Sequence, residues 1–147
     1  MGSTARGLKV NNPGNLRSSL DVFEGQKLIS SDGSFKEFDS LDYGYRAMAI
    51  IIYNYVTKYG SDTIRKIITR YAPPTDGNNT ESYIATVANM VNASPDRVIT
   101  EADFTYPAAS PFMRNVVGSM TKIETGSDPN APELASGYQM FINDRLV

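Results

Sequence analysis

The stretch SLDYGYRAMAIIIYNYVTKYG, residues 40–60, indicates the fold class of this 147-residue chain. Its apolar residues recur at helical spacing, in the rows Ala47, Ile51, Tyr55 and Met48, Ile52, Tyr59. Gly60 provides a stop, because glycine readily adopts the left-handed conformation that ends many helices. The stretch therefore predicts a long helix with one apolar face.

Five more helices are expected after residue 60, because helical spacing continues and each segment opens with a capping residue or a proline. The second predicted helix stops at Pro73, and the fifth stops at Gly126. The expected first residues or caps are Ser61, Thr80, Ser94 with Pro95, Ser110 with Pro111, and Pro132.

Residues 21–38 are the only region that predicts strands. The runs DVFEGQKLIS (21–30) and SFKEF (34–38) are joined at Asp32 and Gly33, a pair typical of hairpin turns. The predicted fold class is therefore α+β, mostly α, with a small β-hairpin near the N-terminus. We expect a flexible arm over residues 1–9 and a single domain over residues 10–147.

Composition removes several kinds of chemistry. The chain has no cysteine and no histidine, which excludes a thiolate nucleophile, a Ser-His-Asp triad and an imidazole or thiolate zinc site. Carboxylates and phenols remain for proton transfer. No acidic metal loop and no glycine-rich phosphate loop is found, so we expect neither a metal nor a cofactor.

Charge and hydropathy limit the partners. The net charge is −2, which offers no electrostatic footprint for nucleic acid. No apolar run approaches the ~18 residues of a membrane span. The N-terminal MGSTARGLKV lacks an apolar core, so no signal peptide is expected.

Glu124 is the first candidate catalytic residue. It falls in the last turn of the predicted fifth helix, where the helix dipole disfavours an anion. Apolar Met120 and Ile123 precede it, and apolar surroundings also raise the pKa of a carboxyl group. A carboxylic acid that keeps its proton near neutral pH can act as the general acid of a glycosidase. The alternative is a solvent-exposed glutamate without a catalytic role.

The C-terminal segments KIETGSDPNA (122–131) and ASGYQMF (135–141) resemble the catalytic segment of the lytic transglycosylase and goose-type lysozyme superfamily. In that superfamily a helix ends in Glu-Ser-Gly and is followed by a Pro-Asn-Ala-like turn and a Gly-Leu-Met-Gln-like stretch. The resemblance implies a lysozyme-like helical domain with Glu124 as catalytic acid and Thr125 where serine is usual. It also places Gly137, Tyr138 and Gln139 near the substrate groove, with Tyr138 as a departure from the pattern.

A second resemblance lies in NNPGNLR (11–17), FKEFDSLDYGYRA (35–47) and RYAPPTDGNNTESY (70–83). These segments are similar in order to bacterial glucosaminidases of the lysozyme superfamily. They look still more like small phage and prophage virion or structural proteins that begin with Asn-Pro-Gly-Asn-Ile-Arg. Tyr71 then matches a catalytic tyrosine, although a core tyrosine is an equal alternative. The implied substrate-binding residues are Asn11, Asn12, Asn15, Arg17, Asn79 and Tyr83, of which Asn79 also suits a helix cap and Tyr83 the core.

The two resemblances occur in the opposite order to the enzymes, in which the glutamate helix precedes the Asn-Asn segment. A circular permutation reconciles them, because the ends of a compact domain commonly lie close together. It predicts that residues 11–17 pack close to Glu124.

Some glycosidases need a second carboxylate. Glu24 is the first candidate and Asp32 the second, although each also suits a solvated hairpin charge. We therefore favour chemistry with a single acid. Arg46, inside the first predicted helix, is expected to pair either with Asp42 or with a carboxylate of the site.

The sequence favours a peptidoglycan-degrading glycosidase, of lytic transglycosylase or muramidase/glucosaminidase type, with Glu124 as general acid. Its expected partners are peptidoglycan glycan strands and other phage virion proteins. Its expected location is a phage virion, or the bacterial cytoplasm before delivery to the cell wall. The first alternative is a noncatalytic virion or wall-binding protein on the same scaffold, and the second is a small adaptor with a tyrosine-rich binding surface.

Overall fold

The computed structural model describes residues 6–146, and helices dominate this part of the chain. The mostly α character predicted from the sequence is confirmed. The elements are α1 (Arg6–Lys9), α2 (Leu41–Lys58), α3 (Ile64–Tyr71), η1 (Pro74–Asp76), α4 (Thr80–Met90), η2 (Glu101–Phe104), α5 (Phe112–Thr125) and α6 (Ala131–Arg145), where η marks a 3-10 helix.

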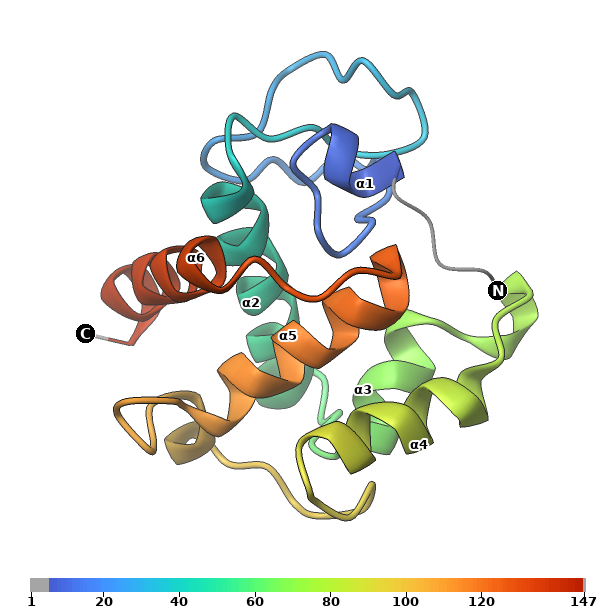
Figure 1. The fold of residues 1–147 in the computed structure, drawn as a ribbon, viewed down its shortest axis with the longest axis vertical. Helices are drawn as coiled ribbons and strands as arrows, with labels where there is room; N and C mark the ends of the chain where they lie inside the picture. The colour runs from blue at the N-terminus through green and yellow to red at the C-terminus, as the bar shows by residue number, and fades with distance from the viewer. Residues whose placement is uncertain (1–5, 147) are drawn as a thin grey trace.

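The helices surround α2, and an irregular layer covers one end of them (Figure 1). Helix α6 makes the most extensive contact with α2, while α3 and α4 form a pair beside α5. The irregular layer consists of α1 and residues 10–40, drawn in blue and cyan in Figure 1. The C-terminal end of α5 reaches this layer through its contact with α1.

The core forms where the apolar faces of the helices meet. Met48 and Ile52 of α2, Ile67 of α3, Val87 of α4 and Phe141 of α6 are all inaccessible to solvent. Burying a side chain of this size contributes about 1.5–3 kcal/mol, which outweighs the small differences in helix propensity between residues. The periodic apolar residues of the sequence therefore determine which face of each helix is buried.

Gly137 allows α6 to lie close to α2. A Cβ atom at this position would stand 2.2 Å from the carbonyl oxygen of Asp42 and 2.8 Å from Cβ of Tyr45. The glycine that the resemblance placed near a substrate groove thus lies in a helix contact.

The predicted helix bounds are mostly correct, and two caps are displaced. Helix α3 is capped by Thr63, whose side chain accepts a hydrogen bond from the Lys66 amide, whereas the predicted cap Ser61 is buried before it. Helix α4 is capped by Asn79 and not by Thr80, which is its first residue.

The short helix predicted at Ser94 is wrong. The Ser94 hydroxyl accepts a hydrogen bond from the Asp96 amide, and one further bond from the Arg97 amide closes a turn. The Ile99 amide then donates to the carbonyl of Asp62, 2.8 Å away, and not to a carbonyl of the preceding turn, so the turn does not continue as a helix. The next regular element is η2.

The predicted β-hairpin is also absent from residues 6–146, which contain only isolated bridges between Arg17 and Phe35 and between Gln26 and Phe38. The reason is that the second predicted strand divides its hydrogen bonds between two partners. The Lys36 amide donates to Leu16, whereas the Lys27 amide donates to the Glu37 carbonyl. Neither pairing extends far enough to form a ladder.

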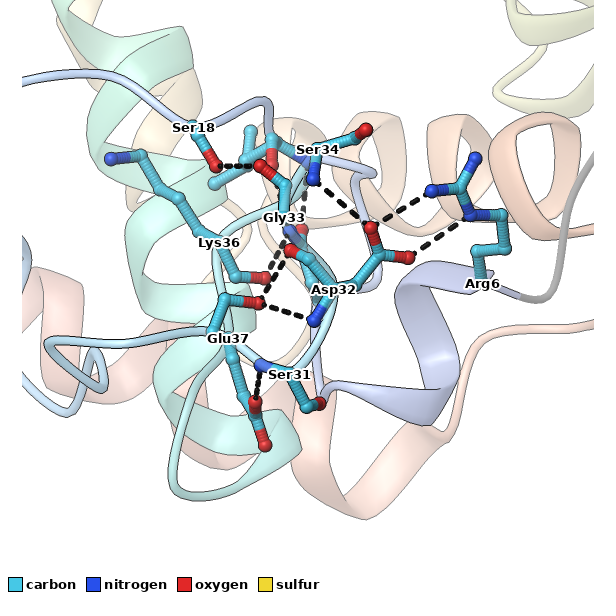
Figure 2. Close-up of polar contacts among 11 residues, drawn as sticks. Arg6, Ser18, Ser31, Asp32, Gly33, Ser34, Lys36 and Glu37 are labelled. Atoms are coloured by element: carbon cyan, nitrogen blue, oxygen red, sulfur yellow. Dashed lines mark hydrogen bonds and ion pairs between the residues drawn. The ribbon is translucent and has the colours of Figure 1, made fainter.

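The predicted turn at Asp32 does form, and side chains hold it (Figure 2). The Phe35 amide donates to the Asp32 carbonyl over 3.2 Å. The guanidinium of Arg6 binds the Asp32 carboxylate through Nε and an Nη atom, at 3.0 and 2.8 Å. The Ser31 amide donates to the carboxylate of Glu37.

The N-terminal arm predicted over residues 1–9 is helical in its second half. Residues 6–9 form α1, and Arg6 joins it to the turn at Asp32. Residues 1–5 of the predicted arm lie outside the described residues.

Candidate functional site

The site is built at the C-terminal end of α5. Gly126 follows the helix with a φ of 77°, and its amide donates to the carbonyl of Lys122. This cap leaves Glu124 in the last turn, as the sequence predicts. The residue is only 9% exposed, so the alternative of a solvent-exposed glutamate is wrong.

Both carboxylate oxygens of Glu124 have hydrogen-bond partners. The side-chain amide of Asn15 donates to Oε1 over 3.2 Å and to the backbone carbonyl of Glu124 over 2.8 Å. The hydroxyl of Tyr83, from α4, donates to Oε2 over 3.0 Å. The carboxyl group is thus held between the N-terminal layer and α4.

Burial raises the pKa of Glu124 above its ordinary value. The hydrogen bonds from Asn15 and Tyr83 and the positive charge of Arg17 act in the opposite direction, but the net shift is upward. The side chain is therefore suited to hold a proton at a pH where an ordinary glutamate has lost it.

The Asn-Pro-Gly-Asn turn carries Asn15 to this position. Asn12 is fully buried, where its amide donates to the carbonyls of Leu16 and Lys36 and its oxygen accepts from the Leu16 amide. Asn11 donates to the carbonyl of Phe38. Asn11 and Asn12 thus shape the loop. The packing of residues 11–17 against Glu124, expected from the circular permutation, is present in the structure.

Asn15 is strained in its backbone, with a φ of 51°, and has one unsatisfied atom. Its Oδ1 is buried and accepts no hydrogen bond from any described residue. A buried acceptor without a partner costs about 1–3 kcal/mol. The contact with Glu124 therefore forms at the expense of local stability.

Tyr71, at the end of α3, lies beside the same carboxyl group. Its hydroxyl donates to the carbonyl of Gly14, and burial together with the negative charge of Glu124 raises its pKa. The phenol is therefore neutral and engaged with the Asn-Pro-Gly-Asn turn.

Two hollows lie next to these residues. A smaller hollow of about 230 Å³ is lined by Asn15, Arg17 and Tyr71. It shares four lining residues with a larger hollow of about 640 Å³, and these are Asp21, Phe23, Ile51 and Tyr55. The two hollows are therefore adjacent, and together they are called the groove, with a narrow part (the smaller hollow) and a wide part (the larger one). Glu124 lies behind its narrow end, in contact with Asn15 but not in the groove wall.

The candidate second carboxylates differ in position. Glu24 lines the wide part of the groove with 59% of its side chain exposed, and it lies 3.5 Å from an Nη atom of Arg46. Arg46 also binds Asp144 of α6 at 2.8 Å. The Asp42 pairing considered for Arg46 is therefore replaced by these two partners. Asp32 is bound to Arg6 and lines neither hollow.

The remaining predicted site residues lie elsewhere. Asn79 caps α4 and lines a separate hollow of about 290 Å³. Tyr138 is buried and donates to the carbonyl of Phe104, while Gln139 is exposed and donates to Asn143. Neither Tyr138 nor Gln139 lines the groove.

Several groove residues were missed from the sequence, namely Asp21, Phe23, Lys36, Lys58, Tyr59, Arg70 and Arg145. Tyr59 was assigned to the apolar helix face, but it is 58% exposed. The sequence signal that could have pointed to the basic residues is a cation in the last turn of each of α2, α3 and α6. Cations at helix C-termini are equally well explained by their favourable interaction with the helix dipole.

Within residues 6–146 no helix combines the length and hydropathy needed to cross a bilayer. The same residues contain no cluster of three or more carboxylates arranged to hold a metal ion.

Comparison with known proteins identifies a phage relative of this chain. No protein-family model matches the sequence. The chain is 37% identical over 139 residues to Protein P5 of Pseudoalteromonas phage PM2, and the aligned region covers 92% of this chain and 81% of the phage protein. At that identity and coverage, the chain belongs to the family of Protein P5 of Pseudoalteromonas phage PM2.

Proposed function

We propose that this protein is a peptidoglycan-cleaving glycosidase of phage origin, with Glu124 as the general acid. The observation that carries the proposal is the buried carboxyl group at the end of α5, whose pKa is raised and which lies behind a groove. Protonation of a glycosidic oxygen needs a carboxylic acid that keeps its proton near neutral pH.

The groove supports the proposal by its size and lining. Its two parts have volumes of about 230 and 640 Å³, and together they fall within the range of sites that hold small ligands. Phe23, Tyr55 and Tyr71 line its narrow part and supply aromatic surface beside Asn15. Asn15 and Tyr71 connect this groove to Glu124.

Chemistry with a single acid is favoured over a pair of carboxylates. Glu24 is the only one of the two candidates that lines the groove, and it is exposed and paired with Arg46. An inverting or covalent retaining enzyme needs a second free carboxylate at a defined distance from the first. A lytic transglycosylase, which uses a hydroxyl group of the substrate as nucleophile, does not. Anhydro-sugar products, identified by mass spectrometry, would distinguish this reaction from hydrolysis.

In the proposed reaction Glu124 donates its proton to the leaving oxygen as the glycosidic bond breaks. The carboxylate that remains is stabilised by the hydrogen bond from Tyr83 to Oε2, which favours the ionised form. A hydroxyl group of the substrate then bonds to the anomeric carbon and gives its proton back to the Glu124 carboxylate. The side-chain amide of Asn15 must move aside for substrate to reach Oε1, and its strained backbone and unsatisfied Oδ1 lower the cost of that movement.

A second function is supported by a different observation. Both oxygens of Glu124 are already bound, and the Tyr71 hydroxyl is bound to Gly14. The same contacts would serve a noncatalytic virion or wall-binding protein in which Glu124 fastens the N-terminal layer to α5. The phage relative is compatible with either function, and in both the partners would include cell-wall glycan and other virion proteins.

Loss of turbidity of purified peptidoglycan distinguishes the two functions. The wild type should clear the suspension, and Glu124→Gln should lower the rate by about 10²–10⁴-fold, the usual contribution of a general acid. Glu81→Gln is the matched control, because it makes the same chemical change on an exposed carboxylate of α4. Circular dichroism should show that all three proteins are folded.

A wild type that binds peptidoglycan in sedimentation but releases no product would support the noncatalytic function. Full activity in folded Glu124→Gln would refute the assignment of the acid.

A further inference from the structure

The charge of the groove is opposite to that of the whole chain. The two hollows are lined by six basic residues and two acidic ones, although the chain carries 14 basic and 16 acidic residues. The basic residues are Arg17, Lys36, Arg46, Lys58, Arg70 and Arg145. A groove that concentrates cations on an acidic protein attracts a ligand that carries several negative charges.

The cations of the groove differ in how they are engaged. Arg46 is nearly buried and is occupied by Glu24 and Asp144, and the ammonium of Lys36 donates to the carbonyl of Asp21. These two groups are held in place by the protein itself. They therefore contribute positive potential more than free hydrogen-bond donors.

Lys58, Arg70 and Arg145, in contrast, have no ion-pair partner within residues 6–146. They come from the last turns of α2, α3 and α6. The guanidinium of Arg70 is held over the rings of Tyr55 and Tyr59, at 5.1 and 4.3 Å from their centroids. The wide part of the groove thus presents three cations whose donors are available to a ligand.

The two acidic residues, Asp21 and Glu24, lie in the same wide part. Glu24 is paired with Arg46, whereas the Asp21 carboxylate has no ion-pair partner among the described residues. A nucleic acid, which carries a phosphate at every step, offers no cation to Asp21. A short peptide with several carboxylates and one free amino group would satisfy both signs of charge. Peptidoglycan carries such peptides on alternate sugars of its glycan strands.

We propose that the wide part of the groove binds the acidic peptide stem of peptidoglycan, while the narrow part beside Asn15 and Tyr71 receives the glycan. The protein would then discriminate between strands that bear peptides and strands from which the peptides have been removed. This inference rests on the proposed function for the identity of the glycan.

Binding is tested in Glu124→Gln, so that the ligand is not consumed, by isothermal titration at low salt. The probes are a disaccharide that carries its peptide stem, the same disaccharide without the stem, and the free stem peptide. A single-stranded oligonucleotide of similar charge is the fourth probe. We expect the stem-bearing disaccharide to bind at least about tenfold more tightly than the bare one, and binding to weaken as salt is raised.

Lys58→Gln combined with Arg145→Gln should lower the ratio of the two affinities, stem-bearing over bare disaccharide, by about fivefold or more, as expected for two exposed charges. The matched control is Lys9→Gln with Lys66→Gln, which removes two exposed lysines outside the groove and should leave the preference unchanged. Equal loss in both double variants would overturn the proposal, because it would indicate a general effect of charge.

Equal binding of the two disaccharides, or tighter binding of the oligonucleotide, would also overturn it. These results are separable from the test of catalysis. A stem preference in a protein that cleaves nothing would keep the groove assignment and refute the glycosidase. Equal cleavage of bare and stem-bearing strands would keep the glycosidase and refute the stem site.

Discussion

Replacement of Asn15 tests how the N-terminal layer is attached to α5. Asn15→Gly removes two hydrogen bonds, one to the Glu124 carbonyl at 2.8 Å and one to its carboxylate at 3.2 Å. A neutral bond contributes about 1 kcal/mol and a bond to a charged group about 1.5–3 kcal/mol. Because the carboxylate bond is long, we expect the two bonds together to contribute about 2–3 kcal/mol. Removal of the buried, unsatisfied Oδ1 offsets about 1 kcal/mol of this, so the free energy of unfolding should fall by about 1–2 kcal/mol. For a domain of this size, that lowers Tm by about 2–8 °C.

Asn15→Ala should cost about 1 kcal/mol more than Asn15→Gly. Both variants lose the amide, but only alanine must adopt the φ of 51° with a Cβ atom, which the left-handed region penalises. Urea denaturation at pH 5 and pH 8 measures both effects. In the wild type the amide bond favours the ionised form of Glu124, so its removal raises the pKa of Glu124 further in the variants. The loss of stability should therefore be larger at pH 8, where Glu124 must give up its proton. An Asn15→Gly variant within about 0.5 kcal/mol of wild type would refute the assigned contact.

Two other predictions concern Glu124 and Gly137. Because burial raises the folded-state pKa of Glu124, the folded protein binds the proton of Glu124 more tightly than the unfolded chain does. The resulting stabilisation is complete below the unfolded pKa of about 4.3 and is lost as pH rises through the folded-state pKa. Wild type should therefore lose stability relative to Glu124→Gln over that window in urea titrations, and a difference independent of pH would contradict the buried environment. Gly137→Ala should lower the free energy of unfolding by about 1–3 kcal/mol, because the added Cβ forces α6 away from α2. Gly33→Ala is the control, since a Cβ there meets nothing within 4 Å, and its Tm in thermal denaturation should stay close to that of the wild type.

The helices could be predicted from the sequence because their signals are local. Apolar spacing located the face of α2, and Gly60 and Gly126 located the ends of α2 and α5. The caps were less certain, since Ser61 and Thr63 both suit a helix start. In the structure the Ser61 amide closes the end of α2 by donating to the Tyr55 carbonyl, and Thr63 is left to cap α3.

The layer over residues 10–40 could not be predicted for the opposite reason. Asp32 and Gly33 do form a turn, yet the residues after it bond to Leu16 and Lys27 and not to one facing strand. Choosing among these partners depends on Asn12, a buried amide that binds both Leu16 and Lys36. No periodicity in the sequence reports such a contact.

Some residues of the candidate site could be predicted from the sequence, and others could not. Glu124 could be identified from its position at the end of a helix, and the proximity of Asn15 followed from the resemblance. The cations of the wide groove could not, because Lys58, Arg70 and Arg145 come from three helix ends that only the folded chain brings together. Tyr138 and Gln139 were named by resemblance alone and lie outside the groove.

The bond between Asn15 and Glu124 also bears on the order of folding. It joins residues 109 positions apart, and closing a loop of that length costs on the order of 4 kcal/mol in chain entropy. Such a contact is expected to form late, after the local helices and their shared core. During synthesis α2, α3 and α4 emerge before α5, so a nascent or partly folded chain has an ordinary, hydrated glutamate at position 124. The proton-holding carboxyl would then be created only when folding is complete.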